Sequence, residues 1–326
     1  MSTPVDPRPV ASAEAEGMAI VARTQAQLVR RRFFRHRLAM ASLVVFMAVL
    51  LLSFSATGIG PIPGWWKHDY TTVATVVDGG RPTLSVVPTF LGGDGVHLGE
   101  HPFGQDNKGI DYFALTMRGT QISVMIAFIV GTLGSFIGVL IGAAAGFFRG
   151  WTETILMRFT DIIIIMPLLA ICAVIANQAG NAGPFWLAVV ISLFTWTGLA
   201  RIVRGEFLSL REKEFVEAAR AAGTPAWRII RKHILPNTLG VILVSATLSL
   251  AGAVILETSL SFLGFGVKPP DTSLGRLISD YQSAFVTRPW LFIWPGVFIV
   301  TIALTVNFIG DGLRDAFDPR QNKVRS

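Results

Sequence analysis

The sequence predicts an all-α integral membrane protein with six transmembrane helices. Of its 326 residues, 52% are hydrophobic and only 15% are charged, whereas soluble globular proteins carry about 25% charged residues. The mean hydropathy is +0.56. Long uncharged stretches recur along the chain, and the core of a bilayer requires about 20 apolar residues in a helix. These observations exclude an ordinary soluble enzyme.

The uncharged stretches give the order of the helices. The first is expected at 38–57, after an N-terminal segment, 1–37, that is too long for the charged start of a signal peptide. A Gly- and Pro-rich outside region follows at 58–117, where we expect short strands and turns and no independent domain. The core with the other five helices covers 118–313. Its uncharged stretches are 119–148, 162–200, 233–256 and 289–310, and a turn signal at 177–184 divides the second of them into two helices.

Lysine and arginine predict the orientation. With the N-terminus inside, the inside segments hold 21 of the 28 Lys and Arg residues. Both termini, including the tail 314–326, are therefore expected in the cytoplasm. The net charge of +7 follows this topology and argues against a nucleic-acid partner. The arginines within 30–37 either attract anionic membrane lipid or only determine the topology.

Glycine recurs at every fourth position of the second predicted helix. This spacing places the glycines on one helix face, where small residues allow a neighbouring helix to approach closely. A flexible gate is the alternative, and we favour packing. The residues are Gly134, Gly138, Gly142 and Gly146.

The largest predicted cytoplasmic loop, 211–237, has the pattern of two helices joined by a glycine. The first helix is expected at 211–222 and ends at Gly223 in a left-handed conformation. Thr224 as N-cap and Pro225 as first residue begin the second helix, which leads into the fifth span. The two helices are apolar on one side and charged on the other, so we expect this elbow to bind a protein partner.

No catalytic or metal-binding pattern is present. The sequence contains no G-x-x-x-x-G-K-[ST] motif for binding nucleotide phosphates, and Cys172 is its single cysteine. We therefore expect no enzyme activity, metal or cofactor in this chain.

One carboxylate, Glu257, lies within a predicted span. A charged group in the bilayer requires a partner or water. It follows Asn237 by 20 residues, a rise of about 30 Å in a helix, which places it near the outer edge of the membrane. It either lines a translocation pathway or forms a structural hydrogen bond to a neighbouring helix.

The elbow resembles the EAA loop of bacterial ABC-importer permeases. Segments 31–38, 101–111, 259–270 and 310–320 further resemble the C-type permease of dipeptide and oligopeptide importers. The residues that match the EAA loop are Glu217, Ala218, Ala219, Gly223, Ile234, Leu235, Pro236 and Asn237.

This resemblance implies a multi-pass subunit of the bacterial cytoplasmic membrane that forms half of a translocation pathway for peptides. It implies four kinds of partner: a second, homologous permease, two cytoplasmic ATPases that hold ATP and Mg²⁺, and an extracytoplasmic peptide-binding protein. The elbow would be the coupling loop to the ATPase. Import of nickel or haem by the same family, and less so a secondary transporter, remain alternatives.

Overall fold

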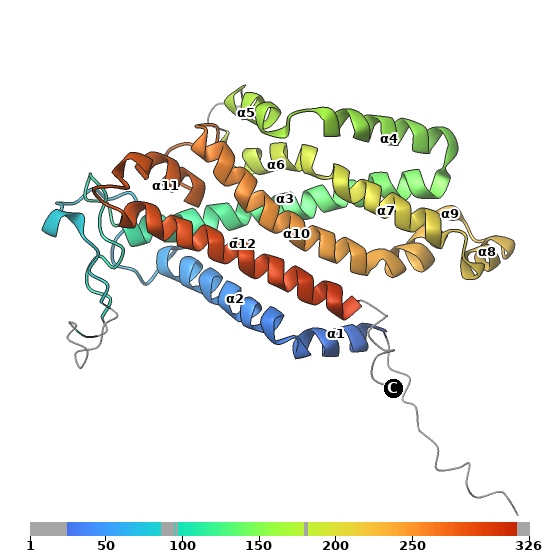
Figure 1. Ribbon diagram of the computed structural model, residues 1–326, viewed down its shortest axis with the longest axis horizontal. Helices are drawn as coiled ribbons and strands as arrows, with labels where there is room; N and C mark the ends of the chain where they lie inside the picture. The colour runs from blue at the N-terminus through green and yellow to red at the C-terminus, as the bar shows by residue number, and fades with distance from the viewer. Residues whose placement is uncertain (1–24, 86–94, 96, 179–181, 318–326) are drawn as a thin grey trace, which may run out of the picture.

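The structure, a computed structural model, describes residues 25–85, 95, 97–178 and 182–317. It is an elongated bundle of helices that run broadly along one axis (Figure 1). The helices are α1 (Gln25–Arg35), α2 (Arg37–Thr57), α3 (Tyr112–Phe148), α4 (Gly150–Ile165), α5 (Leu168–Gln178), α6 (Gly183–Thr195), α7 (Thr197–Leu210), α8 (Glu214–Ala221), α9 (Ala226–Ile229), α10 (Leu235–Phe262), α11 (Leu274–Tyr281) and α12 (Trp290–Phe317), with a π-helical turn, η3 (Ile230–Ile234), between α9 and α10.

Four helical stretches in the described part of the chain are long and apolar enough to cross a membrane alone. They are α2, α3, the continuous stretch Ala226–Phe262 that ends in α10, and α12. Two further pairs pass the same test together but are bent, α4 with α5 by 85° and α6 with α7 by 44°. The prediction of an all-α membrane protein is confirmed, and the number of spans is four to six.

The uncharged stretches place two helix starts too late. The second predicted helix begins at Tyr112, before Arg118, and the third begins at Gly150, well before Asp161. The charges inside these helices are paired: Arg118 Nη2 lies 3.2 Å from Asp271 Oδ1, and Arg201 Nη2 lies 2.6 Å from Asp161 Oδ1. Paired charges are tolerated inside a helical bundle, so a charge does not mark a helix end here.

The chain is bent between α4 and α5 at Pro167. Met166, before the proline, is extended, with φ −68° and ψ 135°. Steric conflict with the proline ring disfavours the helical conformation at the preceding residue. The bend between α4 and α5 therefore has a local cause.

The four predicted glycines of α3 lie against α6 and α7. A Cβ atom on Gly138 would lie 2.9 Å from the Trp196 oxygen, and one on Gly142 would lie 2.4 Å from the Ala200 oxygen. At Gly146 the nearest atom would be the Phe207 Cβ, at 2.6 Å. Only glycine permits this approach.

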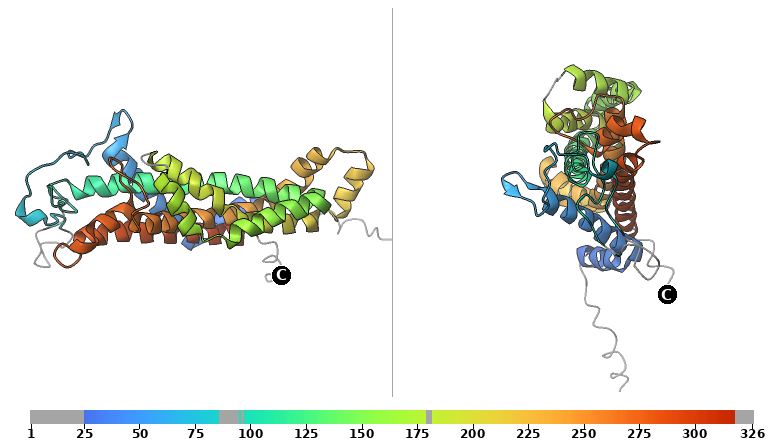
Figure 2. Two further views of the ribbon diagram at one scale, coloured as in Figure 1. Left: turned by 90° about the horizontal axis from the view of Figure 1, so that it is seen from above. Right: turned by 90° about the vertical axis from the view of Figure 1, so that its left-hand side faces the viewer.

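The two ends of the bundle differ. One end, which we call the elbow end, carries α8 and α9, and it also holds α1 and the last turns of α12 (Figures 1 and 2). His36 Nε2, before α2, lies 3.3 Å from Asp315 Oδ2 of α12. The opposite end, the loop end, carries the segment 58–111 and α11. The first and last helices of the described chain thus end on the same side of the bundle.

The segment 58–111 at the loop end has little regular structure. It contains a hairpin of β1 (Gly58–Ile59) and β2 (Ile62–Pro63), a 3₁₀ turn, η1 (Asp78–Gly80), and two isolated bridges. The prediction of short strands and turns is confirmed for its described residues, and 86–94 and 96 lie outside them.

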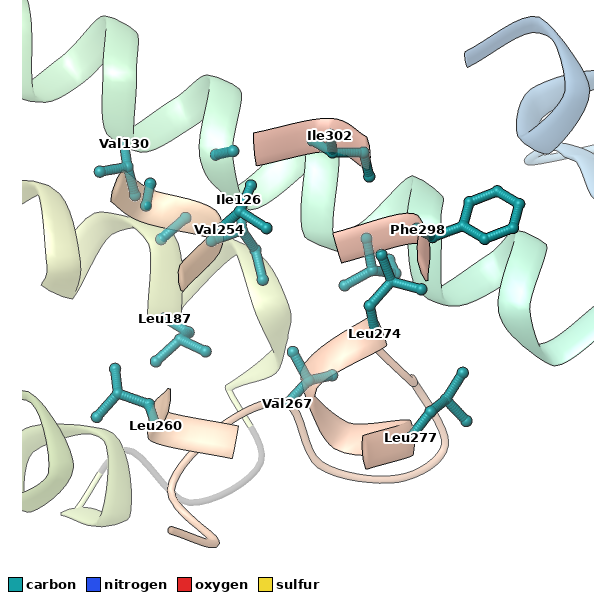
Figure 3. Close-up of a cluster of buried hydrophobic side chains, with 14 of the residues drawn as sticks. Ile126, Val130, Leu187, Val254, Leu260, Val267, Leu274, Leu277, Phe298 and Ile302 are labelled. Atoms are coloured by element: carbon teal, nitrogen blue, oxygen red, sulfur yellow. The ribbon is translucent and has the colours of Figure 1, made fainter. Parts of the chain in front are cut away.

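A hydrophobic core joins the helices near the loop end. Figure 3 shows side chains of this core. They include Ile126 of α3, Leu187 of α6, Val254 of α10, Leu274 of α11 and Ile302 of α12, all buried.

Gly142→Ala should destabilise the protein, because the new methyl group would overlap the α7 backbone. Overpacking of this kind costs about 1–3 kcal/mol. Gly198→Ala in α7 is the matched control, since nothing lies within 4 Å of its Cβ position. We expect a lower thermal unfolding midpoint for purified Gly142→Ala in detergent and no loss for Gly198→Ala. Equal midpoints would contradict the packing assignment.

Candidate functional site

The elbow is formed by α8, Gly223 and α9. Gly223 has φ +73°, a left-handed conformation that glycine adopts without strain, as the sequence predicts. The Gly223 N–H donates to the Arg220 oxygen at 2.9 Å, and the Thr224 N–H donates to the Ala219 oxygen at 3.0 Å. These bonds close the end of α8 and turn the chain back toward the bundle.

Two details of the elbow differ from the sequence interpretation. The first helix begins at Glu214 and not at 211, after a turn over 211–213. Thr224 is not the N-cap of the second helix: Pro225 holds that position in an extended conformation. N–H groups at the start of a helix have no helical partner. Proline has no N–H, so it is tolerated at this position. Helix α9 then continues through η3 into α10.

One face of α8 packs into the protein. Val216 is fully buried against Phe147, Phe207, Ile229 and Ile234. The cluster contains residues of α3, α7, α9 and η3, so the elbow is fixed to the bundle by apolar contacts.

Two arginines also hold the elbow to the end of α3. The guanidinium carbons of Arg211 and Arg220 lie 5.9 Å and 5.6 Å from the centre of the Phe147 ring, within range of a cation–π interaction. Arg211 Nη1 also donates to the Phe147 backbone oxygen. That oxygen belongs to the last turn of α3, where carbonyls lack helical partners.

Several other side chains of the elbow are exposed. Glu217 and Ala218 are exposed, Ala219 is half-buried, and Phe215 and Trp227 are 42% and 59% exposed. Glu217 has no ion pair or side-chain hydrogen bond within the described chain. The surface therefore combines two exposed large apolar side chains with an unpaired carboxylate.

The second part of the predicted motif lies where η3 becomes α10. Ile234 is fully buried in the same cluster as Val216, while Pro236 and Asn237 are exposed. Pro236 occupies the first turn of α10, where its missing N–H is tolerated. Asn237 Nδ2 donates to the His233 oxygen at 2.6 Å. These residues join the elbow to α10.

Glu257 lies far from the elbow, near the loop end of α10, and is fully buried. Its Oε1 accepts hydrogen bonds from Ser261 Oγ and Ser273 Oγ, both at 2.6 Å. Its Oε2 accepts one from Ser123 Oγ at 3.1 Å. The hydroxyl groups come from α10, from the residue before α11, and from α3. Sequence reasoning missed Ser123 and Ser273, which are distant in sequence and belong to no motif.

A second polar cluster organises the loop end. Asp111 is the N-cap of α3, where its Oδ1 accepts the Ala114 N–H at 2.7 Å and the Trp66 indole N–H at 3.0 Å. Its Oδ2 lies 2.7 Å from His101 Nδ1. These bonds hold the 58–111 segment to the start of α3.

Tyr281, the last residue of α11, donates from its hydroxyl to Asp106 Oδ2 at 2.9 Å. Burial raises the pKa of Tyr281, and the charge of Asp106 raises it further, so the phenol keeps its proton and donates this bond. Elsewhere, a small pocket of about 120 Å³ lies between the start of α6 and the 266–271 loop.

Nothing in the described part of the chain gathers three His, Cys, Asp or Glu side chains in a metal-binding arrangement. The arrangement offers two buried or partly buried structural networks and several exposed side chains on the elbow.

Comparisons with known proteins agree with this geometry. Residues 138–323 match the family described as "Binding-protein-dependent transport system inner membrane component", and residues 24–75 match the "N-terminal TM domain of oligopeptide transport permease C". The oligopeptide transport system permease protein OppC of Mycobacterium tuberculosis H37Rv is 36% identical over 91% of this chain and 96% of its own length. The protein of the same name from Haemophilus influenzae is 36% identical over 94% and 92%.

A solved structure of the MetNI methionine ABC transporter, in an inward-facing conformation, contains a chain with a similar fold. Its TM-score is 0.53 at 20% identity, and the match covers 63% of this chain and 96% of the other. With the sequence matches above, the chain belongs to the binding-protein-dependent transport permeases and, within them, to the group of oligopeptide permease C proteins.

Proposed function

We propose that this chain is the permease subunit of an ATP-driven importer for peptides, in which the elbow is the contact with an ATPase subunit. The observation that carries the proposal is the exposure of Phe215, Glu217 and Trp227 on the elbow. Outside the bilayer, large exposed apolar side chains are typical of a protein interface. The family match supplies the class of partner.

The proposed assembly has two permeases, two ATPases that hold ATP and Mg²⁺, and an extracytoplasmic binding protein. Peptides are the proposed substrate because the related proteins are named oligopeptide permeases. The permease would form half of the pathway and pass the motion of the ATPase to it. The side chains of Glu217, Ala218, Ala219 and the Gly223 turn would carry the contact.

The proposed topology has six spans, with α4–α5 and α6–α7 each counted as one. The elbow end would face the cytoplasm of a bacterial cell and the loop end the outside. Two observations support it: α1 and the end of α12 lie on the elbow side, and lysine and arginine concentrate in the segments at that end.

Cysteine labelling tests the topology. With Cys172 replaced by serine, single cysteines at Thr72, an exposed residue of the loop end, and at Thr224 of the elbow should label from opposite faces of intact cells. An impermeant maleimide added outside should react at position 72 alone, and at 224 only after permeabilisation. Reaction of both from outside would exclude the six-span topology.

Gly223→Val tests coupling in the complete transporter. A β-branched residue in a left-handed conformation is strained by about 1–3 kcal/mol. The strain acts on the angle between α8 and α9, since nothing lies within 4 Å of the Cβ position. We expect normal membrane insertion and a loss of ATP-driven uptake of a labelled oligopeptide of about tenfold or more.

Gly223→Asn is the matched control, because asparagine tolerates the left-handed conformation. It should retain most of the uptake. Normal uptake by Gly223→Val, or an equal loss in both variants with normal amounts of assembled complex, would refute the role proposed for the turn.

A further inference from the structure

The start of α11 is held by a chain of hydrogen bonds that ends at Glu257. The Leu274 N–H donates to Ser123 Oγ at 3.1 Å, and the Arg276 N–H donates to Ser273 Oγ at 3.1 Å. Both hydroxyl groups then donate to the carboxylate of Glu257. Two N–H groups at the start of α11 are therefore linked to the same carboxylate, and one serine hydroxyl forms each link. Negative charge near a helix N-terminus is stabilising.

Close backbone contacts make this arrangement possible. A Cβ atom on Gly275 would lie 2.5 Å from the Thr258 Cα of α10, and one on Gly119 of α3 would lie 3.1 Å from the Ser273 carbonyl carbon. Glycine at these two positions lets α11 lie directly on α10 and α3. The hydroxyl groups of Ser123 and Ser273 then come within hydrogen-bonding distance of Glu257.

The surroundings of Glu257 leave no access for a substrate. Its side chain has no exposed surface, and three hydroxyl donors of the same chain occupy its oxygens. A carboxylate that recognised a passing peptide amine would need a free oxygen at the surface of a pathway. The enclosed network instead satisfies a buried charge with donors from three parts of the fold.

Glu257 also lies on the helix that begins at the elbow. The stretch Ala226–Phe262 runs without interruption from α9 through η3 and α10, and Glu257 is one turn from its far end. One helical stretch therefore connects the elbow with the point where α11 is attached. At the other end of α11, Tyr281 donates a hydrogen bond to Asp106 of the segment 58–111.

We infer that Glu257 is a positioning residue, which holds α11 to α10 and α3 so that α11 moves with α10 when the elbow moves. The motion of the elbow rests on the proposed function. The attachment of α11 by Glu257 is independent of that function. Helix α11 is then the element that carries the state of the elbow to the loop end. No direct contact between Glu257 and substrate is involved.

Backbone hydrogen exchange in the assembled transporter, in lipid nanodiscs, tests the attachment. In Glu257→Ala, Ser273→Ala and Ser123→Ala, the amides of residues 274–281 should exchange about tenfold faster, since a hydrogen bond at the helix start is lost. Glu257→Gln should have a smaller effect: its amide can replace Oε1 as an acceptor but leaves the Ser123 hydroxyl without one. Ser259→Ala is the matched control, because that hydroxyl bonds only to Ile255 of its own helix, at 2.9 Å.

ATP hydrolysis tests the consequence. The three alanine variants that affect α11 should keep the basal ATPase rate and lose stimulation by the loaded binding protein. A general loss of stability would lower both rates together, and it would also speed exchange throughout α2 and α12. If Glu257→Ala does not assemble, the two serine variants still test the inference, since each removes only a single hydroxyl.

Several results would overturn the inference. One is unchanged exchange of 274–281 in the variants, and another is faster exchange spread equally over the bundle. A third is a loss of uptake in Glu257→Gln that affects peptides with a free amino terminus but not amino-blocked ones, with exchange unchanged. That result would make Glu257 a substrate-binding residue. If the wild-type transporter takes up no peptide while the exchange pattern is as expected, the proposed substrate fails and the attachment of α11 stands.

Discussion

The close contact of α3 with α6 and α7 is the constraint on which the rest of the bundle depends. Lipid tails are as apolar as leucine, so helices in a membrane associate through tight packing and hydrogen bonds. Gly138, Gly142 and Gly146 bring the backbones of α3 and α7 together. With one face of α3 so fixed, its other faces receive α2, α10, α11 and α12. Helix α3 thereby reaches both the elbow, through Phe147, and the α11 attachment, through Ser123.

Polar groups close the bundle at both ends because unpaired ones are costly there. At the elbow end, Arg211 donates to a free carbonyl of α3 and lies with Arg220 over the Phe147 ring. At the loop end, two free N–H groups of α11 donate to Ser123 and Ser273, and both hydroxyl groups donate to Glu257. One site neutralises the negative end of a helix with cations and the other places a carboxylate behind a positive end. Helices α3 and α10 both connect these two sites.

The sequence predicts the apolar helices and the two elbow helices joined by Gly223 because their signals are local. A run of uncharged residues indicates a membrane span, because charges are costly to remove from water. Gly223 indicates the left-handed end of one helix, and Pro225 indicates the start of the next. The same reasoning fails where a charge is paired: Arg118 and Asp161 lie inside helices because Asp271 and Arg201 neutralise them. The Glu257 network could not be predicted, because Ser123 and Ser273 are distant in sequence and serine carries no periodic signal. The sequence identifies the carboxylate as unusual, and its partners follow only from the packing of α3 and α11.

An exposed apolar side chain has a different meaning within a candidate membrane span and on the elbow. On α4, Ile155, Ile162 and Ile165 are largely uncovered, but lipid tails would satisfy them as well as a second subunit would. Phe215 lies on α8, a short charged helix outside the candidate spans, and the proposed topology places it in the cytoplasm. In that topology, lipid does not account for the exposure of Phe215. This difference, more than the total apolar surface, makes the elbow the part of the chain that indicates a protein partner.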